Sequence, residues 1–140
     1  MLWIKGFKDN PKELKLVWLA IFCLYFGFGV YSAVYYNFLT EVIKIRPEQL
    51  GYVEALRELP GFLCVFVTAL AVRLAAPVLG SISLLLMSIE MYAYSSITGL
   101  PSLMLWSFIW SMGFHVWYPI QPALVLKMSK DGQEGKSLGD

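Results

Sequence analysis

Four long apolar stretches divide this chain and leave it few folds to adopt. They cover residues 16–39, 50–72, 78–98 and 102–126. Each is close to the roughly 20 residues that an α-helix needs to cross a hydrocarbon layer about 30 Å thick. The breaks between them carry charge, proline or glycine, at Lys44, Arg46 and Pro47, at Arg73 and Pro77, and at Gly99 and Pro101. The pattern predicts an all-α integral membrane protein with four transmembrane helices. Because the last two links are very short, the second, third and fourth helices are expected to be antiparallel neighbours.

The composition agrees with burial in lipid. Of the 140 residues, 58% are hydrophobic and 15% are charged, whereas soluble domains are about half apolar and about a quarter charged. Little length remains for a soluble catalytic domain, so residues 1–140 are expected to form a single transmembrane domain. The formal net charge of +1 does not provide the strongly basic surface that nucleic-acid binding requires. The expected partner is the lipid bilayer and not a nucleic acid.

Lysine and arginine are distributed unevenly between the two sides of the predicted helices. The side that holds both termini carries Lys5, Lys8, Lys12, Lys15, Arg73, Lys127, Lys130 and Lys136, and the other side carries Lys44 and Arg46. Because positively charged flanks stay in the cytoplasm, both termini are expected to be cytoplasmic in a multi-pass protein of the cell (plasma or inner) membrane. The first stretch is longer than the roughly 7 to 15 residue core of a signal peptide, so it is expected to be a retained helix.

Three ionisable side chains occur together in the first turns of the second stretch. Glu54, Arg57 and Glu58 are spaced i, i+3, i+4, which places them on one helical face. Gly51 and Gly61 extend this face, so a neighbouring backbone is expected to approach closely there. Charge inside a bilayer is costly and often marks a functional group. The cluster suggests a gate, a proton-linked carboxylate or a substrate contact, and the alternative is an ion pair within the helix near the headgroups.

Glu90 lies near the middle of the third stretch. Its helical face also carries Gly80, Ser83, Met87 and Tyr94. Small residues let membrane helices pack closely, so Glu90 is expected to point into the bundle. A rise of about 1.5 Å per residue places Arg57 about 10 Å and Glu90 about 15 Å from the outer helix ends. We therefore predict an ion pair between Arg57 and Glu90, the alternative being a protonated Glu90 with a local hydrogen bond.

The fourth stretch carries two stripes of different character. Its polar stripe comprises Ser107, Ser111, His115 and Tyr118, and its aromatic stripe comprises Trp106, Trp110, Gly113 and Trp117. The polar stripe could line a cavity, and the aromatic stripe is expected to serve packing or lipid contact. His115 can change charge near neutral pH, so it is a candidate proton carrier or, alternatively, a hydrogen-bonded interior group. Pro119 lacks an amide hydrogen and is expected to kink the helix.

Three local strings resemble the beginning of a major facilitator superfamily (MFS) permease. They are residues 47–51 continuing to 57–62, residues 113–119, and residues 135–139. The likeness extends over nearly the whole chain. It implies the first four transmembrane helices of the amino-terminal bundle of a longer permease. Such a permease moves a small solute by rocking its two halves about a central site.

One motif of that family is degenerate here. The family has Gly-x-x-x-Asp-Arg-x-Gly at the cytoplasmic end of the second helix, and the matching residues are Thr68, Val72, Arg73 and Ala75. Only Arg73 is kept, so the charges of the second and third helices are candidates to replace the usual cytoplasmic gate. Four helices do not enclose a pathway between two halves. The chain is therefore expected to be a fragment of a longer permease, to act with a partner chain, or to be inert alone.

The resulting functional prediction is transport of a small solute by an MFS-type secondary transporter. Proton coupling through Glu54, Glu58, Glu90 or His115 is compatible with it. The rival is a small accessory or scaffold membrane protein that binds other membrane subunits and transports nothing. The sequence contains no nucleophile elbow, metal motif or phosphate-binding loop, so no enzymatic activity, cofactor or metal is expected. A membrane-embedded enzyme is the third alternative.

Overall fold

Four long helices dominate the computed structural model, which describes residues 11–71, 74–129, 132 and 135, with the backbone alone at 64, 65 and 67–71. They are α2 (Lys12–Asn37), α3 (Pro47–Ala71), α4 (Ala76–Ala93) and α5 (Leu100–Met128). A π-helical turn, η1 (Phe38–Val42), extends α2, and a 3-10 turn, η2 (Tyr94–Ser96), extends α4. The prediction of an all-α fold with four helices is confirmed, and each helix overlaps its predicted stretch along nearly its whole length.

Two of these helices, taken with their terminal turns, are long and apolar enough to cross a membrane. They are Lys12–Val42 and Ala76–Ser96. Helices α3 and α5 fall outside the same limits of length, hydropathy and charge. Length and composition of the described helices therefore support two of the four predicted spans.

Local sequence explains where the helices begin. Pro47 opens α3, and Pro77 lies in the first turn of α4. Proline is tolerated there because the first amides of a helix have no intrahelical partner. At the start of α5, Ser102 Oγ accepts hydrogen bonds from the backbone amides of Thr98 at 3.2 Å and Gly99 at 3.3 Å. Pro47, Pro77 and Gly99, from the predicted breaks, therefore lie at or next to the starts of helices.

The chain leaves α2 through the wider turn of η1. Thr40 Oγ1 donates a hydrogen bond to the Tyr36 carbonyl oxygen at 2.9 Å, and the Ile45 amide donates to the Leu39 carbonyl oxygen at 3.0 Å. Lys44 then adopts a φ of 54°, the left-handed region that side-chain-bearing residues adopt only occasionally. The turn directs the chain from the end of α2 into α3.

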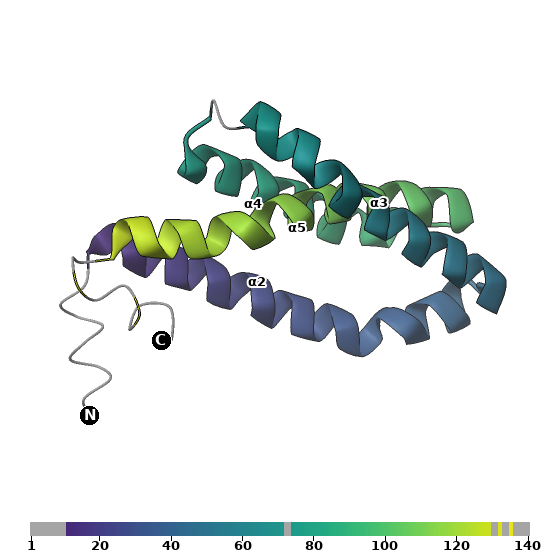
Figure 1. The fold of residues 1–140 in the computed structure, drawn as a ribbon. Coiled ribbons are helices and arrows are strands. Elements are labelled where there is room, and N and C mark those ends of the chain that lie inside the picture. The colour runs from purple at the N-terminus through teal and green to yellow at the C-terminus, as the bar shows by residue number, and fades with distance from the viewer. Residues whose placement is uncertain (1–10, 72–73, 130–131, 133–134, 136–140) are drawn as a thin grey trace.

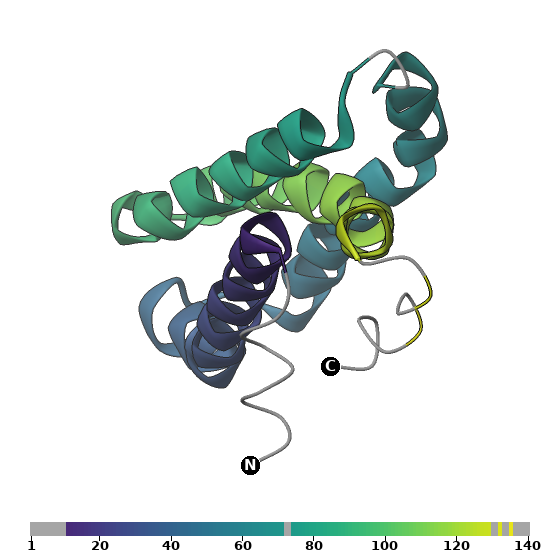
Figure 2. The same ribbon diagram turned by 90° about the vertical axis from the view of Figure 1, so that its left-hand side faces the viewer.

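Helix α5 is the central element of the bundle (Figures 1 and 2). It packs most extensively against α4, and it also packs against α3 and α2. In contrast, α3 and α4 do not pack along each other, although only a few residues join them in sequence. Successive antiparallel packing was expected for the second, third and fourth helices; this is right for α4 with α5 and wrong for α3 with α4. A short link fixes the positions of two helix ends but not the directions in which the helices run.

Gly113 determines how closely α4 and α5 approach. A Cβ atom at this position would lie 2.7 Å from the Ser83 carbonyl oxygen and 2.9 Å from Met87 Cγ. Gly80 is a second close point, where a Cβ atom would lie 3.2 Å from Leu124 Cδ1. These glycines therefore let the two backbones approach more closely than larger residues would permit.

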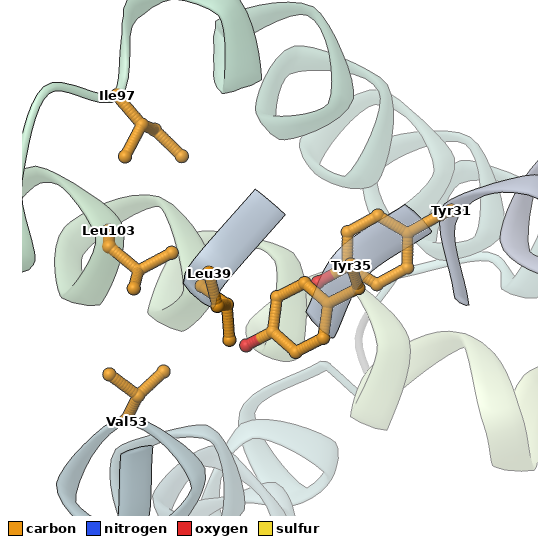
Figure 3. Close-up of a cluster of buried hydrophobic side chains, with 6 residues drawn as sticks. All are labelled: Tyr31, Tyr35, Leu39, Val53, Ile97 and Leu103. Carbon is orange, nitrogen blue, oxygen red and sulfur yellow. The ribbon is translucent and has the colours of Figure 1, made fainter. Parts of the chain in front are cut away.

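Two clusters of buried hydrophobic side chains hold the helices together. The cluster in Figure 3 comprises Tyr31, Tyr35, Leu39, Val53, Ile97 and Leu103. It draws on α2 with its π turn, on α3, on the segment before α5 and on α5 itself. The second cluster comprises Met87, Trp110, Trp117 and Leu124, and it joins α4 to α5. Trp106 is partly buried against the first cluster, so the packing role expected for the aromatic stripe is confirmed.

Replacing Gly113 with alanine is expected to lower the free energy of unfolding by about 1 to 3 kcal/mol, the usual effect of overpacking a close interface. Gly51→Ala is the matched control, because no atom lies within 4 Å of a Cβ atom built there. Alanine in place of a helical glycine is neutral or stabilises by about 0.5 to 1 kcal/mol. Thermal unfolding followed by circular dichroism compares the two variants. Equal stability would contradict the close α4–α5 interface.

Candidate functional site

A largely buried guanidinium group lies where α2, α3 and α5 meet. The guanidinium carbon of Arg57 lies 5.3 Å from the centre of the Tyr35 ring and 5.1 Å from that of the Trp110 ring. Both distances are typical of cation–π contacts. The Arg57 side chain is 14% exposed. Because Tyr35 belongs to α2 and Trp110 to α5, this one side chain of α3 links three helices.

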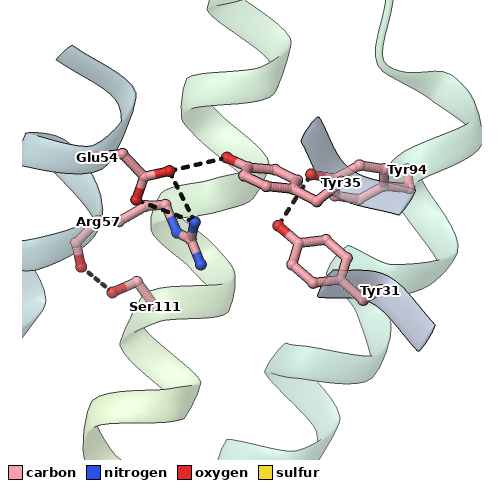
Figure 4. A network of polar contacts seen from close by, with 6 residues as sticks. All are labelled: Tyr31, Tyr35, Glu54, Arg57, Tyr94 and Ser111. Atoms are coloured by element: carbon pink, nitrogen blue, oxygen red, sulfur yellow. Dashed lines mark hydrogen bonds and ion pairs between the residues drawn. The ribbon is translucent and has the colours of Figure 1, made fainter. Parts of the chain in front are cut away.

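Glu54, one turn earlier on α3, balances the charge of Arg57. Nη1 of Arg57 donates a hydrogen bond to each carboxylate oxygen at 3.2 Å (Figure 4). The Tyr35 hydroxyl also donates to Glu54 Oε1, at 3.4 Å. The Glu54 side chain is 39% exposed. The ion pair therefore reaches from the interior of the bundle to its surface.

The predicted ion pair between Arg57 and Glu90 is wrong. Arg57 pairs with Glu54, so the alternative of an ion pair within the helix is confirmed for these two residues. The prediction compared depths along the bundle, but α3 and α4 are not packed against each other. A carboxylate three residues away on the same helix is already within reach.

Glu90 points into the bundle, as predicted, and is only 1% exposed. Neither of its carboxylate oxygens has a hydrogen-bond partner among the residues that the structure describes. The alternative of a local hydrogen bond is therefore not observed. Glu90 interacts electrostatically with Arg57 and with Tyr94. Ser107 on α5 is a second buried group of this kind, because its hydroxyl lacks a partner within the same described ranges.

Three tyrosines extend the site, and they were not predicted as site residues. The hydroxyls of Tyr31 and Tyr94 lie 3.1 Å apart (Figure 4), and their rings meet edge to face with centroids 5.4 Å apart. Tyr35 completes the set through its contacts with Arg57 and Glu54. The signal that could have identified two of them is the recurrence of Tyr31, Tyr35 and Leu39 every four residues, which marks the buried face of α2.

Two members of the polar stripe of α5, Ser111 and His115, face α3. The Ser111 hydroxyl donates a hydrogen bond to the Arg57 carbonyl oxygen and lies 3.0 Å from His115 Nδ1. Nε2 of His115 is 3.8 Å from Glu58 Oε2. Ser111 and His115 thus connect the two helices. Tyr118, the last member of the predicted stripe, is exposed, and its ring contacts that of Phe114 on the same helix.

The predicted packing and kink residues have different outcomes. A Cβ atom at Gly61 would lie 2.8 Å from His115 Nε2, so the close approach predicted there is confirmed. The one predicted at Gly51 is wrong, because nothing lies within 4 Å of that position. Helix α5 continues through Pro119, and a kink at this residue stays a prediction. Arg73 lies outside the described residues.

The site combines the guanidinium group of Arg57, three carboxyl groups, the imidazole of His115 and several hydroxyls, and aromatic rings lie beside the guanidinium. These groups can hold a charged or polar partner through hydrogen bonds, and the carboxyl groups can exchange protons. Within the described part of the chain, no group of three or more His, Cys, Asp or Glu side chains is placed to hold a metal ion.

Comparison with known proteins gives no match to this chain among protein-family models, curated proteins or solved structures. The resemblance to the major facilitator superfamily therefore depends on the sequence strings alone.

Arg57→Ala is expected to lower the free energy of unfolding by about 1 to 3 kcal/mol. The change leaves Glu54 unpaired and removes the cation–π contacts, and the exposure of Glu54 keeps the loss below that for a fully buried pair. The matched control is Arg46→Ala, which breaks an exposed ion pair with Glu48 and should cost less than about 1 kcal/mol. Chemical unfolding of both variants measures the difference. A smaller loss for Arg57→Ala than for Arg46→Ala would contradict the central role of Arg57.

Proposed function

We propose that this protein crosses the membrane with all four helices and moves a small solute as an MFS-type secondary transporter, or as part of one. The observation that carries the proposal is the Arg57 site, in which a largely buried guanidinium group and the buried Glu90 lie among helices that expose many large apolar side chains. Charged residues inside a membrane protein commonly mark the pathway of a substrate or ion. The resemblance to the family adds the transport class.

The surface of the bundle supports insertion in lipid. In the most apolar window of α2 only 6% of the residues are buried, and in that of α4 only 28%. Core helices of soluble proteins are mostly buried, so these helices need another apolar environment. Large hydrophobic side chains are exposed on every helix, among them Phe22, Phe26, Phe62, Phe66, Leu85, Tyr92 and Leu105. Contiguous apolar surface of this kind marks a membrane or protein contact.

The proposed topology places both termini in the cytoplasm and the link between α2 and α3 on the outer side of the cell membrane. Fusion of a reporter that is active only outside the cytoplasm should give no signal at either terminus. Insertion of the same reporter between Ile43 and Arg46 should give a signal. A positive signal from either terminal fusion would contradict the proposed orientation.

The site contains contacts that would stabilise one packing of the helices and would have to break before the helices adopt a second packing. Arg57 holds α2, α3 and α5 together through Tyr35 and Trp110, while Glu58 and His115 connect α3 with α5 near the surface. Rocking of one helix group against another would require these contacts to be exchanged. Ser111 and Tyr118 belong to the same stripe of α5 as His115 and therefore lie next to these contacts. Proton coupling through Glu54, Glu58, Glu90 or His115 would bias such an exchange.

Uptake into lipid vesicles tests the proposal. The full chain, reconstituted at two pH values, is assayed with a panel of labelled metabolites. At least one solute should accumulate, and Arg57→Ala should reduce its uptake at least tenfold because the contacts that switch during transport are lost. Arg46→Ala should leave uptake within about twofold, since its ion pair is exposed. Absence of uptake for every solute would count against transport by this chain alone.

The second candidate is an accessory or scaffold subunit in the membrane. The exposed apolar surface of α2 favours it, because many large hydrophobic side chains of that helix, among them Phe22, Phe26 and Val30, are exposed. A scaffold would copurify from native membranes with a constant set of membrane subunits and show no uptake. The two candidates therefore differ in both measurements.

A further inference from the structure

We propose that Glu90 is a proton-binding site in the interior of the bundle, where it holds a proton that it exchanges with water when the helices repack. The site is defined by burial and by missing partners. Glu90 is 1% exposed, and both oxygens of its carboxyl group are buried without a hydrogen-bond partner in the described ranges. A carboxylate in that position would be a buried charge without donors, which is far more costly than a neutral acid.

The other candidates for proton coupling are differently placed. Glu54 is bound through both oxygens to Arg57 and accepts from Tyr35. Glu58 is largely exposed and lies beside His115, which is also next to Ser111. Each of these groups already has a polar partner or water. Among these candidate groups, the gain or loss of one proton at Glu90 therefore has the largest effect on the free energy of this helix packing.

The charged and titratable groups around Glu90 explain why it is not neutralised by an ion pair. Arg57 on α3 interacts with Glu90 electrostatically, but its Nη1 donates to Glu54. On the other side, Tyr94 interacts with Glu90 and is hydrogen-bonded to Tyr31 of α2. On α5, the buried hydroxyl of Ser107 does not titrate. The nearest counter-charge is thus engaged elsewhere.

The register of α4 and α5 places Glu90 and Ser107 at one level of the bundle. Ser83 lies against Gly113 between the two antiparallel helices, since a Cβ atom at Gly113 would lie 2.7 Å from the Ser83 carbonyl oxygen. Glu90 follows Ser83 by seven residues, and Ser107 precedes Gly113 by six. At about 1.5 Å per residue, both groups lie about 9 to 11 Å from that point in the same direction. Two unpartnered buried polar groups therefore share this level, where a repacked interface could admit water.

A bound proton would favour the packing seen in this structure. Loss of the proton would leave a buried charge, and any packing that hydrates Glu90 or gives it donors would then gain population. This coupling role rests on the proposed transport function. The proposed proton site does not depend on the transport function, because it is defined by the burial of Glu90 in the structure without a solute.

Infrared difference spectroscopy of the full chain in lipid vesicles tests the site directly. A protonated carboxyl group has a carbonyl stretch distinct from that of a carboxylate, and the band shifts when water is replaced by heavy water. At neutral pH the parent chain should show an acid band that disappears in Glu90→Gln. Glu54→Gln and Ser107→Ala should retain it, as matched controls for a paired carboxylate and a neighbouring buried hydroxyl.

Two results would overturn the proposal. One is an infrared spectrum in which the band of the protonated carboxyl group is identical in the parent chain and in Glu90→Gln, which would show that Glu90 is ionised. The other is loss of the band on addition of sodium at constant pH, which would identify a metal cation as the occupant.

If Glu90→Gln does not fold, Glu90→Asp replaces it and should shift the band instead of removing it. An unchanged band in Glu90→Asp would also reject the assignment. Failure of solute uptake leaves these outcomes unaffected, so the two proposals fail separately.

Discussion

The arrangement of the helices depends on how the charge of Arg57 is accommodated. A guanidinium group is costly to bury unless its charge is balanced and its faces are covered. Glu54 balances the charge from the same helix, and the rings of Tyr35 and Trp110 cover the faces from two other helices. The residue that would otherwise oppose folding thus becomes the contact that joins α2, α3 and α5.

Helix α5 can serve as the centre because its faces differ in chemistry. The side with Gly113 is small and admits the backbone of α4, whereas the side with Ser111 and His115 is polar and binds α3. The large ring of Trp110 lies between the sides and stacks on Phe28 of α2. Each neighbour is therefore selected by a different kind of contact, and α3 and α4 are kept apart by the helix between them.

Hydropathy and helix-breaking residues were sufficient to predict the four helices, because these signals are local. Burial of Glu90 and the packing role of Trp110 and Trp117 also followed from helical periodicity. Periodicity shows which residues share a face, but it does not show which helix that face meets. The errors at Arg57 with Glu90, at Gly51 and in the adjacency of α3 and α4 have this common cause. Tyr31 was missed because its partner, Tyr94, lies 63 residues away in sequence.

The π-helical turn at η1 imposes a requirement on chain length as well as on residue type. A π turn contains one residue more than an α turn, which rotates everything after it by about 100° relative to a regular continuation. After this turn, Ile43 and Ile45 pack against the cluster around Leu39. Natural variants of this segment are thus free to exchange one aliphatic side chain for another, whereas insertions and deletions would turn the connection to α3 away from the bundle.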